Sequence, residues 1–121
     1  MSQLKLYGLK RCSTCVKALA WLEDNKQIYT FTDYREDPID PNQLLAWQEQ
    51  LGGWEKLVNR ASMTWRNLPE DRKAPENDAA WLTLIAEFPT LIKRPVLLKD
   101  ETVMVGFSEK KYAALLQESG A

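Results

Sequence analysis

The sequence has 121 residues, of which 45% are apolar, and this suits a single domain spanning residues 1–121 with one buried core. Its net charge of -1 and pI of about 5.5 exclude the broad basic surface that nonspecific nucleic-acid binding requires, so we expect no direct nucleic-acid contact. No apolar run approaches the roughly 20 residues of a membrane helix, and the first residues lack a secretory signal, so we expect a cytoplasmic protein without membrane association.

The first third of the chain has the pattern of a βαβ unit. Residues 4–7 alternate apolar with polar and lead into Gly8, which predicts a short strand followed by a turn. Apolar residues recur at helical spacing from Cys12 to about Lys26, which predicts a helix, and Asp24 and Asn25 offer a natural stop. Residues 28–34 are rich in β-branched and aromatic side chains and therefore predict a second strand.

The middle of the chain, about residues 38–88, is predicted to be a helical insert. We expect helical segments at residues 41–51, 54–58 and about 77–87, with a polar stretch around Trp65 between the last two. Pro41 fits the first turn of the first helix, and Gly52 and Gly53 end it. Most of the five tryptophans are expected to be core residues.

The last part of the chain predicts a hairpin followed by a helix. Residues 95–99 and 102–106 read as two strands joined by a short acidic turn. Ser108 is placed to cap a final helix over residues 109–117. The order βαβ, helical insert, ββα predicts an α/β protein of thioredoxin-like fold with a small mixed four-stranded sheet.

The residues available for chemistry are restricted, because the chain has two cysteines, Cys12 and Cys15, and no histidine. A zinc site would lack ligands, and catalysis that relies on a histidine base is not available. We therefore expect no bound metal. Any chemistry must rest on thiolates and cations.

Cys12 lies where the loop that begins at Gly8 meets the first predicted helix, so free backbone N–H groups should face its sulfur. A cysteine pKa of about 8.5 falls to about 3.5–7.5 at helix N-termini with cationic neighbours, and Lys10 and Arg11 are the local cations. The alternative is a buried, inert thiol. The turn at Gly8 favours the reactive thiol.

Cys15 lies one helical turn after Cys12, close enough to attack an oxidised Cys12 and resolve it as a disulfide. The alternative is a core position, because Cys15 shares an apolar face with Leu19 and Leu22. Both interpretations stay open at this point.

Arg94 precedes Pro95 at the start of a predicted strand, and X–Pro bonds are those that can be cis. A cis bond would turn Arg94 toward the loop of Cys12. The alternative is an ordinary loop arginine followed by a proline at a strand edge.

Three segments, residues 5–15, 58–60 and 91–96, together resemble the ArsC family of arsenate reductases and their relatives. The resemblance implies a thioredoxin-like fold with a helical insert and a nucleophilic cysteine at Cys12. It also implies that Arg60 and Arg94 bind an oxyanion and lower the thiol pKa, that Pro95 is the family's cis proline, and that glutathione and glutaredoxin are reductants.

Residues 105–109 contain no arginine, whereas arsenate reductases proper have a third arginine there. Gly106-Phe107-Ser108 makes the chain most similar to the YffB-like branch of the family. The CxxC pair also resembles Spx, a redox-sensing regulator that binds the RNA polymerase α subunit through a surface that includes a glycine of the insert. Gly52 or Gly53 could correspond to that glycine.

The sequence thus predicts a glutathione-dependent thiol oxidoreductase of the arsenate reductase type. Cys12 would be the nucleophile, Cys15 or glutathione would resolve the intermediate, and the substrate anion would be bound by Arg60, Arg94, Lys10 and Arg11. We expect a monomer without a bound cofactor, with glutathione or glutaredoxin as partner. The alternatives are an Spx-like regulator that binds RNA polymerase through a CxxC switch, and a redox-silent scaffold.

Overall fold

The computed structural model describes residues 4–118, which divide into two compact units. The first unit comprises the described residues up to Asp33 and those from Arg94 onward, and it holds the sheet and both cysteines. The second unit, Tyr34–Lys93, is mainly helical and interrupts the first in the sequence. No helix within the described residues is long and apolar enough to cross a membrane.

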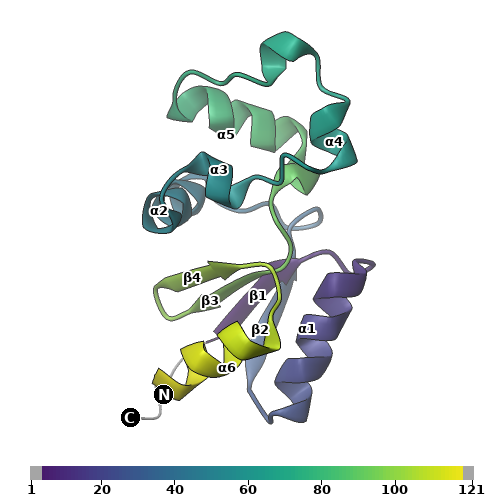
Figure 1. The fold of residues 1–121 in the computed structure, drawn as a ribbon, viewed down its shortest axis with the longest axis vertical. Helices are drawn as coiled ribbons and strands as arrows, with labels where there is room; N and C mark the ends of the chain where they lie inside the picture. Colours follow the sequence, from purple (N-terminus) through teal and green to yellow (C-terminus); the bar gives the residue numbers. More distant parts are fainter. Residues whose placement is uncertain (1–3, 119–121) are drawn as a thin grey trace. The chain divides into compact units, whose positions relative to one another are not determined.

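The first unit is built on a four-stranded mixed sheet. Its strands are β1 (Leu4–Gly8), β2 (Tyr29–Asp33), β3 (Val96–Lys99) and β4 (Thr102–Val105), in the spatial order β2-β1-β3-β4. β1 is parallel to β2 and antiparallel to β3, and β3 is antiparallel to β4. Helices α1 (Ser13–Asp24) and α6 (Glu109–Glu118) cover the same face of this sheet (Figure 1). This arrangement is a thioredoxin-like fold, so the predicted fold class is confirmed.

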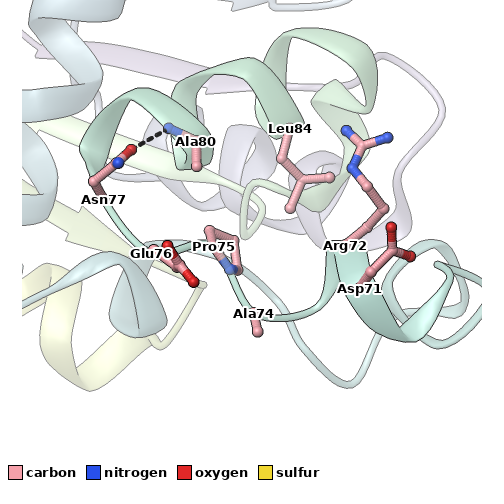
Figure 2. A pocket seen from close by; sticks show the side chains of 8 residues that line it. All are labelled: Asp71, Arg72, Ala74, Pro75, Glu76, Asn77, Ala80 and Leu84. Carbon is pink, nitrogen blue, oxygen red and sulfur yellow. Dashed lines mark hydrogen bonds between the residues drawn. The ribbon is translucent and has the colours of Figure 1, made fainter.

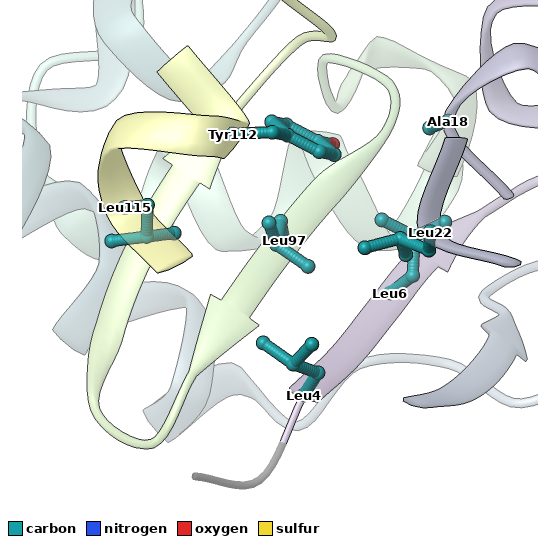
Figure 3. Close-up of a cluster of buried hydrophobic side chains, with 7 residues drawn as sticks. All are labelled: Leu4, Leu6, Ala18, Leu22, Leu97, Tyr112 and Leu115. Atoms are coloured by element: carbon teal, nitrogen blue, oxygen red, sulfur yellow. The ribbon is translucent and has the colours of Figure 1, made fainter. Parts of the chain in front are cut away.

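The core of this unit lies between the sheet and the two helices. It is formed by one buried cluster of side chains from β1, α1, β3 and α6, shown in Figure 3: Leu4, Leu6, Ala18, Leu22, Leu97, Tyr112 and Leu115. Each fully buried leucine contributes about 1.5–3 kcal/mol relative to an exposed one. The buried Lys99 donates a hydrogen bond of 2.7 Å from Nζ to the carbonyl oxygen of Leu115. A cation therefore holds the last turns of α6, where the helix carbonyls carry partial negative charge.

The end of α1 falls at the predicted stop of Asp24 and Asn25, although helical spacing continues to about Lys26. The helix ends at Asp24, and β2 begins at Tyr29, one residue later than predicted, with Ile28 90% exposed outside the strand. Lys26 adopts a left-handed φ of 58°, and the N–H groups of Lys26 and Gln27 donate to the carbonyls of Glu23 and Leu22. These two hydrogen bonds form a Schellman motif, which ends the helix without the usual glycine.

The second unit contains four helices and two 3-10 turns among its described residues. They are α2 (Pro41–Leu51), α3 (Trp54–Leu57), α4 (Met63–Arg66), η1 (Glu70–Arg72), α5 (Asp78–Glu87) and η2 (Pro89–Leu91). The polar stretch around Trp65 therefore includes a short helix that the prediction missed. Its N-cap is Ser62, whose hydroxyl accepts a hydrogen bond of 3.2 Å from the Trp65 N–H.

Three indoles stack in the second unit. The ring centroid of Trp81 lies 6.0 Å from that of Trp54 and 5.9 Å from that of Trp65, with interplanar angles of 11° and 16°. The Trp54 indole N–H also donates to the carboxylate of Asp78 at 2.8 Å. The stack joins α3 and α4 to α5. This contact stabilises the two short helices, which are too short to be stable alone. Trp54 and Trp65 are buried, as is Trp47 on α2, which confirms that these tryptophans are core residues.

Candidate active site around Cys12

Cys12 is the N-cap residue of α1, with extended backbone angles of φ -87° and ψ 123°. Its N–H donates to the Leu9 carbonyl at 3.2 Å, and its carbonyl accepts from Val16 at 2.9 Å, so the loop and the first helical turn meet at this residue. The carboxylate of Asp33, at the end of β2, accepts a hydrogen bond of 3.1 Å from the Lys10 N–H. These hydrogen bonds hold Cys12 at the N-terminus of α1, where the residue is half-buried.

Asp33 is not among the site residues predicted from the sequence. Its register partner on β1 is Gly8, so the carboxylate lies at the edge of the sheet from which the Cys12 loop departs. An acidic residue at the end of the second strand of a βαβ unit is the signal that could have revealed it, because the carboxyl ends of parallel strands meet at one edge. Asp33 thus belongs to the structural support of the candidate site.

The environment of Cys12 favours the thiolate. Burial raises the pKa of Cys12, but the backbone amide and thiol of Cys15, the backbone amide of Thr14 and the charge of Arg94 together lower it below its ordinary value. The sulfur makes no capping hydrogen bond of full geometry. The lowered pKa is therefore best explained by several weak dipolar contributions plus one guanidinium charge.

Cys15 has the opposite character, because it is fully buried on the inner face of α1. Burial raises its pKa to about 11, and the neighbouring Cys12 sulfur adds to this shift. Burial, together with the charge of Cys15, also raises the pKa of Tyr112, so that this phenol is neutral at ordinary pH. Of the two thiols, Cys12 therefore ionises more readily, whereas Cys15 stays protonated at neutral pH.

Gly8 explains how the sulfur of Cys15 fits beside β1. A Cβ atom at position 8 would lie 2.5 Å from the Cys15 sulfur, closer than real Cβ atoms approach other heavy atoms. Glycine is required at this position because the Cys15 sulfur approaches the backbone closely, and a side chain would occupy the place of the sulfur.

The peptide bond between Arg94 and Pro95 is cis. Pro95 is buried, and its carbonyl accepts a hydrogen bond of 2.8 Å from the Gly106 N–H. Arg94 is half-buried, and its charge acts on both Cys12 and Cys15. Lys10 and Arg11, the predicted local cations, are exposed. The charge that lowers the pKa of Cys12 is thus that of Arg94, which is distant in the sequence.

Arg60 belongs to the second unit, in the loop that follows α3. Asn59 holds this loop: its N–H donates to the Leu91 carbonyl at 2.8 Å, and its side chain accepts from the Ala61 N–H at 3.0 Å. The Arg60 guanidinium lies 3.7 Å from the carboxylate of Glu55. Among the predicted site residues, Gly8, Lys10, Arg11, Cys12, Cys15, Arg94 and Pro95 share the first unit, and Arg60 lies in the second.

A cavity of about 300 Å³ lies within the second unit, beside the N-terminus of α5 (Figure 2). Its lining includes Asp71, Arg72 and Asn77, and the Asn77 side chain caps α5 by accepting a hydrogen bond of 2.8 Å from the Ala80 N–H. None of the predicted site residues lines this cavity. Within residues 4–118, no cluster of three or more His, Cys, Asp or Glu side chains could hold a metal ion.

A known protein family matches most of this chain. The sequence model described as ArsC family matches residues 7–115, and the chain therefore belongs to the ArsC family. The family resemblance expected from the three sequence segments is confirmed.

Similar proteins place the chain more closely within this family. The solved structure of the YffB protein is 41% identical, covers 93% of this chain and 97% of its own, and superposes with a TM-score of 0.83. An arsenate reductase (ArsC) related protein from Brucella melitensis is 40% identical, covers 93% of this chain and 92% of its own, and has a TM-score of 0.72. The global transcriptional regulator Spx 1 of Lactococcus lactis is 28% identical over 115 residues, covering 93% of this chain and 88% of its own.

We predict that the two thiols react with iodoacetamide in separate pH ranges. Only the thiolate is alkylated, so the rate at Cys12 should rise with pH and level off with a midpoint below about 8.5, the ordinary cysteine value. Cys15 should stay unreactive until the pH approaches its pKa of about 11. Mass spectrometry of the modified peptides at each pH measures both rates.

Arg94→Gln should move the Cys12 midpoint upward, because it removes the guanidinium charge. Arg11→Gln is the matched control, since it removes an exposed cation adjacent to Cys12 in the sequence and should leave the midpoint nearly unchanged. A wild-type midpoint at or above 8.5 contradicts the assignment of Cys12 as the activated thiol.

We also predict that Gly8→Ala destabilises the protein by about 1–3 kcal/mol, because the new methyl group would overpack against the Cys15 sulfur. Urea unfolding monitored by tryptophan fluorescence measures the loss. The double variant Gly8→Ala/Cys15→Ala should recover part of it relative to Cys15→Ala alone, since the clashing sulfur is then absent. Equal losses in both backgrounds would show that the close approach is not the cause.

Proposed function

We propose that this protein is a thiol-based oxidoreductase that depends on glutathione and uses Cys12 as its nucleophile. The observation that supports this most is the opposite shift of two thiol pKa values one helical turn apart, lowered for half-buried Cys12 and raised for buried Cys15. A structural cysteine pair would not need one thiol ionised and accessible. Membership of the ArsC family supports the same chemistry.

In the proposed reaction, the Cys12 thiolate attacks a sulfur of a disulfide substrate. A bond forms between Cys12 and that sulfur, the substrate S–S bond breaks, and the other substrate sulfur leaves as a thiolate. In the first route, a glutathione thiolate attacks the substrate sulfur of the mixed disulfide, forms a glutathione–substrate disulfide and releases the Cys12 thiolate. In the second route, Cys15 loses its proton and attacks the Cys12 sulfur, and the remaining substrate sulfur leaves as a thiolate. In the second route the resulting Cys12–Cys15 disulfide is reduced by two glutathione thiols, which leave as glutathione disulfide.

An oxyanion such as arsenate is the second substrate class of this proposal. The Cys12 sulfur would bond to arsenic with loss of one oxygen as water. Attack of a glutathione thiolate on the Cys12 sulfur would then form a mixed disulfide and break the S–As bond, whose electron pair stays on arsenic, so that arsenite is released. A second glutathione thiol or glutaredoxin would reduce the mixed disulfide and restore the Cys12 thiolate. Arg94 would hold negative charge beside the sulfur, and Arg60 would supply a second guanidinium. Because the third arginine of arsenate reductases proper is absent from residues 105–109, we expect weaker oxyanion binding.

The test is a coupled NADPH assay with glutathione, glutathione reductase and glutaredoxin, supplied with either arsenate or hydroxyethyl disulfide. We expect turnover of the disulfide that is lost in Cys12→Ser, because the variant lacks the nucleophile. Arg94→Gln should lower the rate at neutral pH, because it removes one of the contributions that lower the pKa of Cys12. Turnover of neither substrate above the Cys12→Ser background would overturn the proposal, and turnover of the disulfide alone would remove arsenate from it.

A second candidate function is that of an Spx-like regulator. It is favoured by the 28% identity to Spx 1 of Lactococcus lactis and by Gly52, which is exposed, has a left-handed φ of 100° and has no neighbour within 4 Å of an added Cβ. An open glycine on the insert suits contact with a flat partner surface. In this proposal the Cys12–Cys15 pair would switch affinity for the RNA polymerase α subunit between its dithiol and disulfide states.

We predict for this alternative that the oxidised and reduced proteins bind purified α subunit with different affinities in a titration calorimeter. Gly52→Arg should abolish binding, because the new side chain occupies the open surface. Gly106→Arg is the matched control, since Gly106 also has a left-handed φ, of 79°, and open space around an added Cβ. No binding in either redox state removes this candidate.

A further inference from the structure

Glu55 on α3 and Arg60 in the loop that follows form an ion pair in the second unit. The Glu55 carboxylate lies 3.7 Å from the Arg60 guanidinium, and the two side chains are 66% and 52% exposed. Glu55 lies in the first turn of α3, directly after the buried Trp54, whose indole donates to Asp78. The pair therefore results from two backbone positions that are each held in place.

The loop that carries Arg60 is fixed by backbone and side-chain hydrogen bonds. Val58 pairs with Ile92 in an antiparallel bridge, and the Lys93 N–H donates to the Leu57 carbonyl at 2.9 Å. The Ser62 hydroxyl donates to the Asn59 carbonyl at 2.8 Å. With the backbone held on both sides, the freedom that remains to Arg60 is that of its own side chain.

We propose that Glu55 is an internal competitor for Arg60 that sets the affinity of the protein for its anionic substrate. This inference rests on the proposed function, in which Arg60 binds an anion. In the protein without substrate, the Glu55 carboxylate pairs with the Arg60 guanidinium and orients the arginine side chain. An incoming oxyanion competes with Glu55 for the Arg60 guanidinium, to which it can bind through two hydrogen bonds.

The size of this competition follows from the exposure of the pair. Exposed ion pairs are weak, so Glu55 lowers anion affinity without preventing binding. A bidentate oxyanion can replace a carboxylate that approaches only to 3.7 Å. Removal of the Glu55 charge should therefore tighten anion binding by about two- to fivefold.

The experiment measures arsenate binding in the Cys12→Ser background, where no sulfur chemistry can occur. The Arg60 side-chain Nε–Hε signal of nitrogen-15-labelled protein is followed as sodium arsenate is added, and calorimetry gives the affinity where that signal is lost. Glu55→Gln should tighten binding about two- to fivefold, and Arg60→Gln should weaken it. In Glu55→Gln/Arg60→Gln, the effect of the glutamine at position 55 should vanish, because there is no guanidinium to release.

Glu70→Gln is the matched control, since Glu70 is an exposed carboxylate of the same unit that pairs with Lys73, and it should leave affinity unchanged. If Arg60→Gln weakens binding but Glu55→Gln does not tighten it, the competitor role is overturned and the proposed function stands. If Arg60→Gln leaves affinity unchanged, the anion-binding role of Arg60 in the proposed function fails, and the role of Glu55 fails with it. If Glu70→Gln tightens arsenate binding as much as Glu55→Gln does, the gain comes from the net charge of the protein, and the role of the Glu55–Arg60 pair is overturned.

Discussion

The fit of the Cys15 sulfur beside Gly8 is the packing constraint on which the unequal character of the two thiols depends. The glycine leaves room for the sulfur, and Cys15 faces the core on the same side of α1 as Ala18 and Leu22. Cys12, three residues earlier, is the N-cap residue of the helix and lies beside its free amides. One thiol is therefore buried in an apolar core, whereas the other lies next to backbone dipoles and is influenced by the charge of Arg94.

The charges around this site come from distant parts of the chain. Arg94 enters the site from the segment before β3, and Asp33 holds the loop of Cys12 from the end of β2. Neither position is local to Cys12 in sequence. Arg60 belongs to the helical unit, where Glu55 already neutralises part of its charge. Within the first unit the charge beside the Cys12 sulfur is that of Arg94, and within the second unit the carboxylate beside Arg60 is that of Glu55.

Local signals predicted most element boundaries well and missed one short helix. Pro41, Gly52 and Ser108 begin or end helices as expected, and the Ser108 hydroxyl accepts from the Lys111 N–H at 3.4 Å. Lys26 takes a left-handed conformation usually given to glycine, so α1 ends at the predicted stop of Asp24 and Asn25 even though helical spacing continues to about Lys26. The helix around Trp65 was missed because it has a single turn, too short for periodicity to reveal.

The sequence by itself determined the order of strands and helices, the position of Cys12 at a helix start and the membership of both cysteines in one helical turn. These follow from residue spacing and capping, which act over a few positions. Only the tertiary structure decided that Arg94 rather than Lys10 or Arg11 lowers the pKa of Cys12, that Asp33 anchors its loop, and that Glu55 pairs with Arg60. Electrostatic effects depend on distance and burial in space, and the spacing of residues along a chain does not specify either.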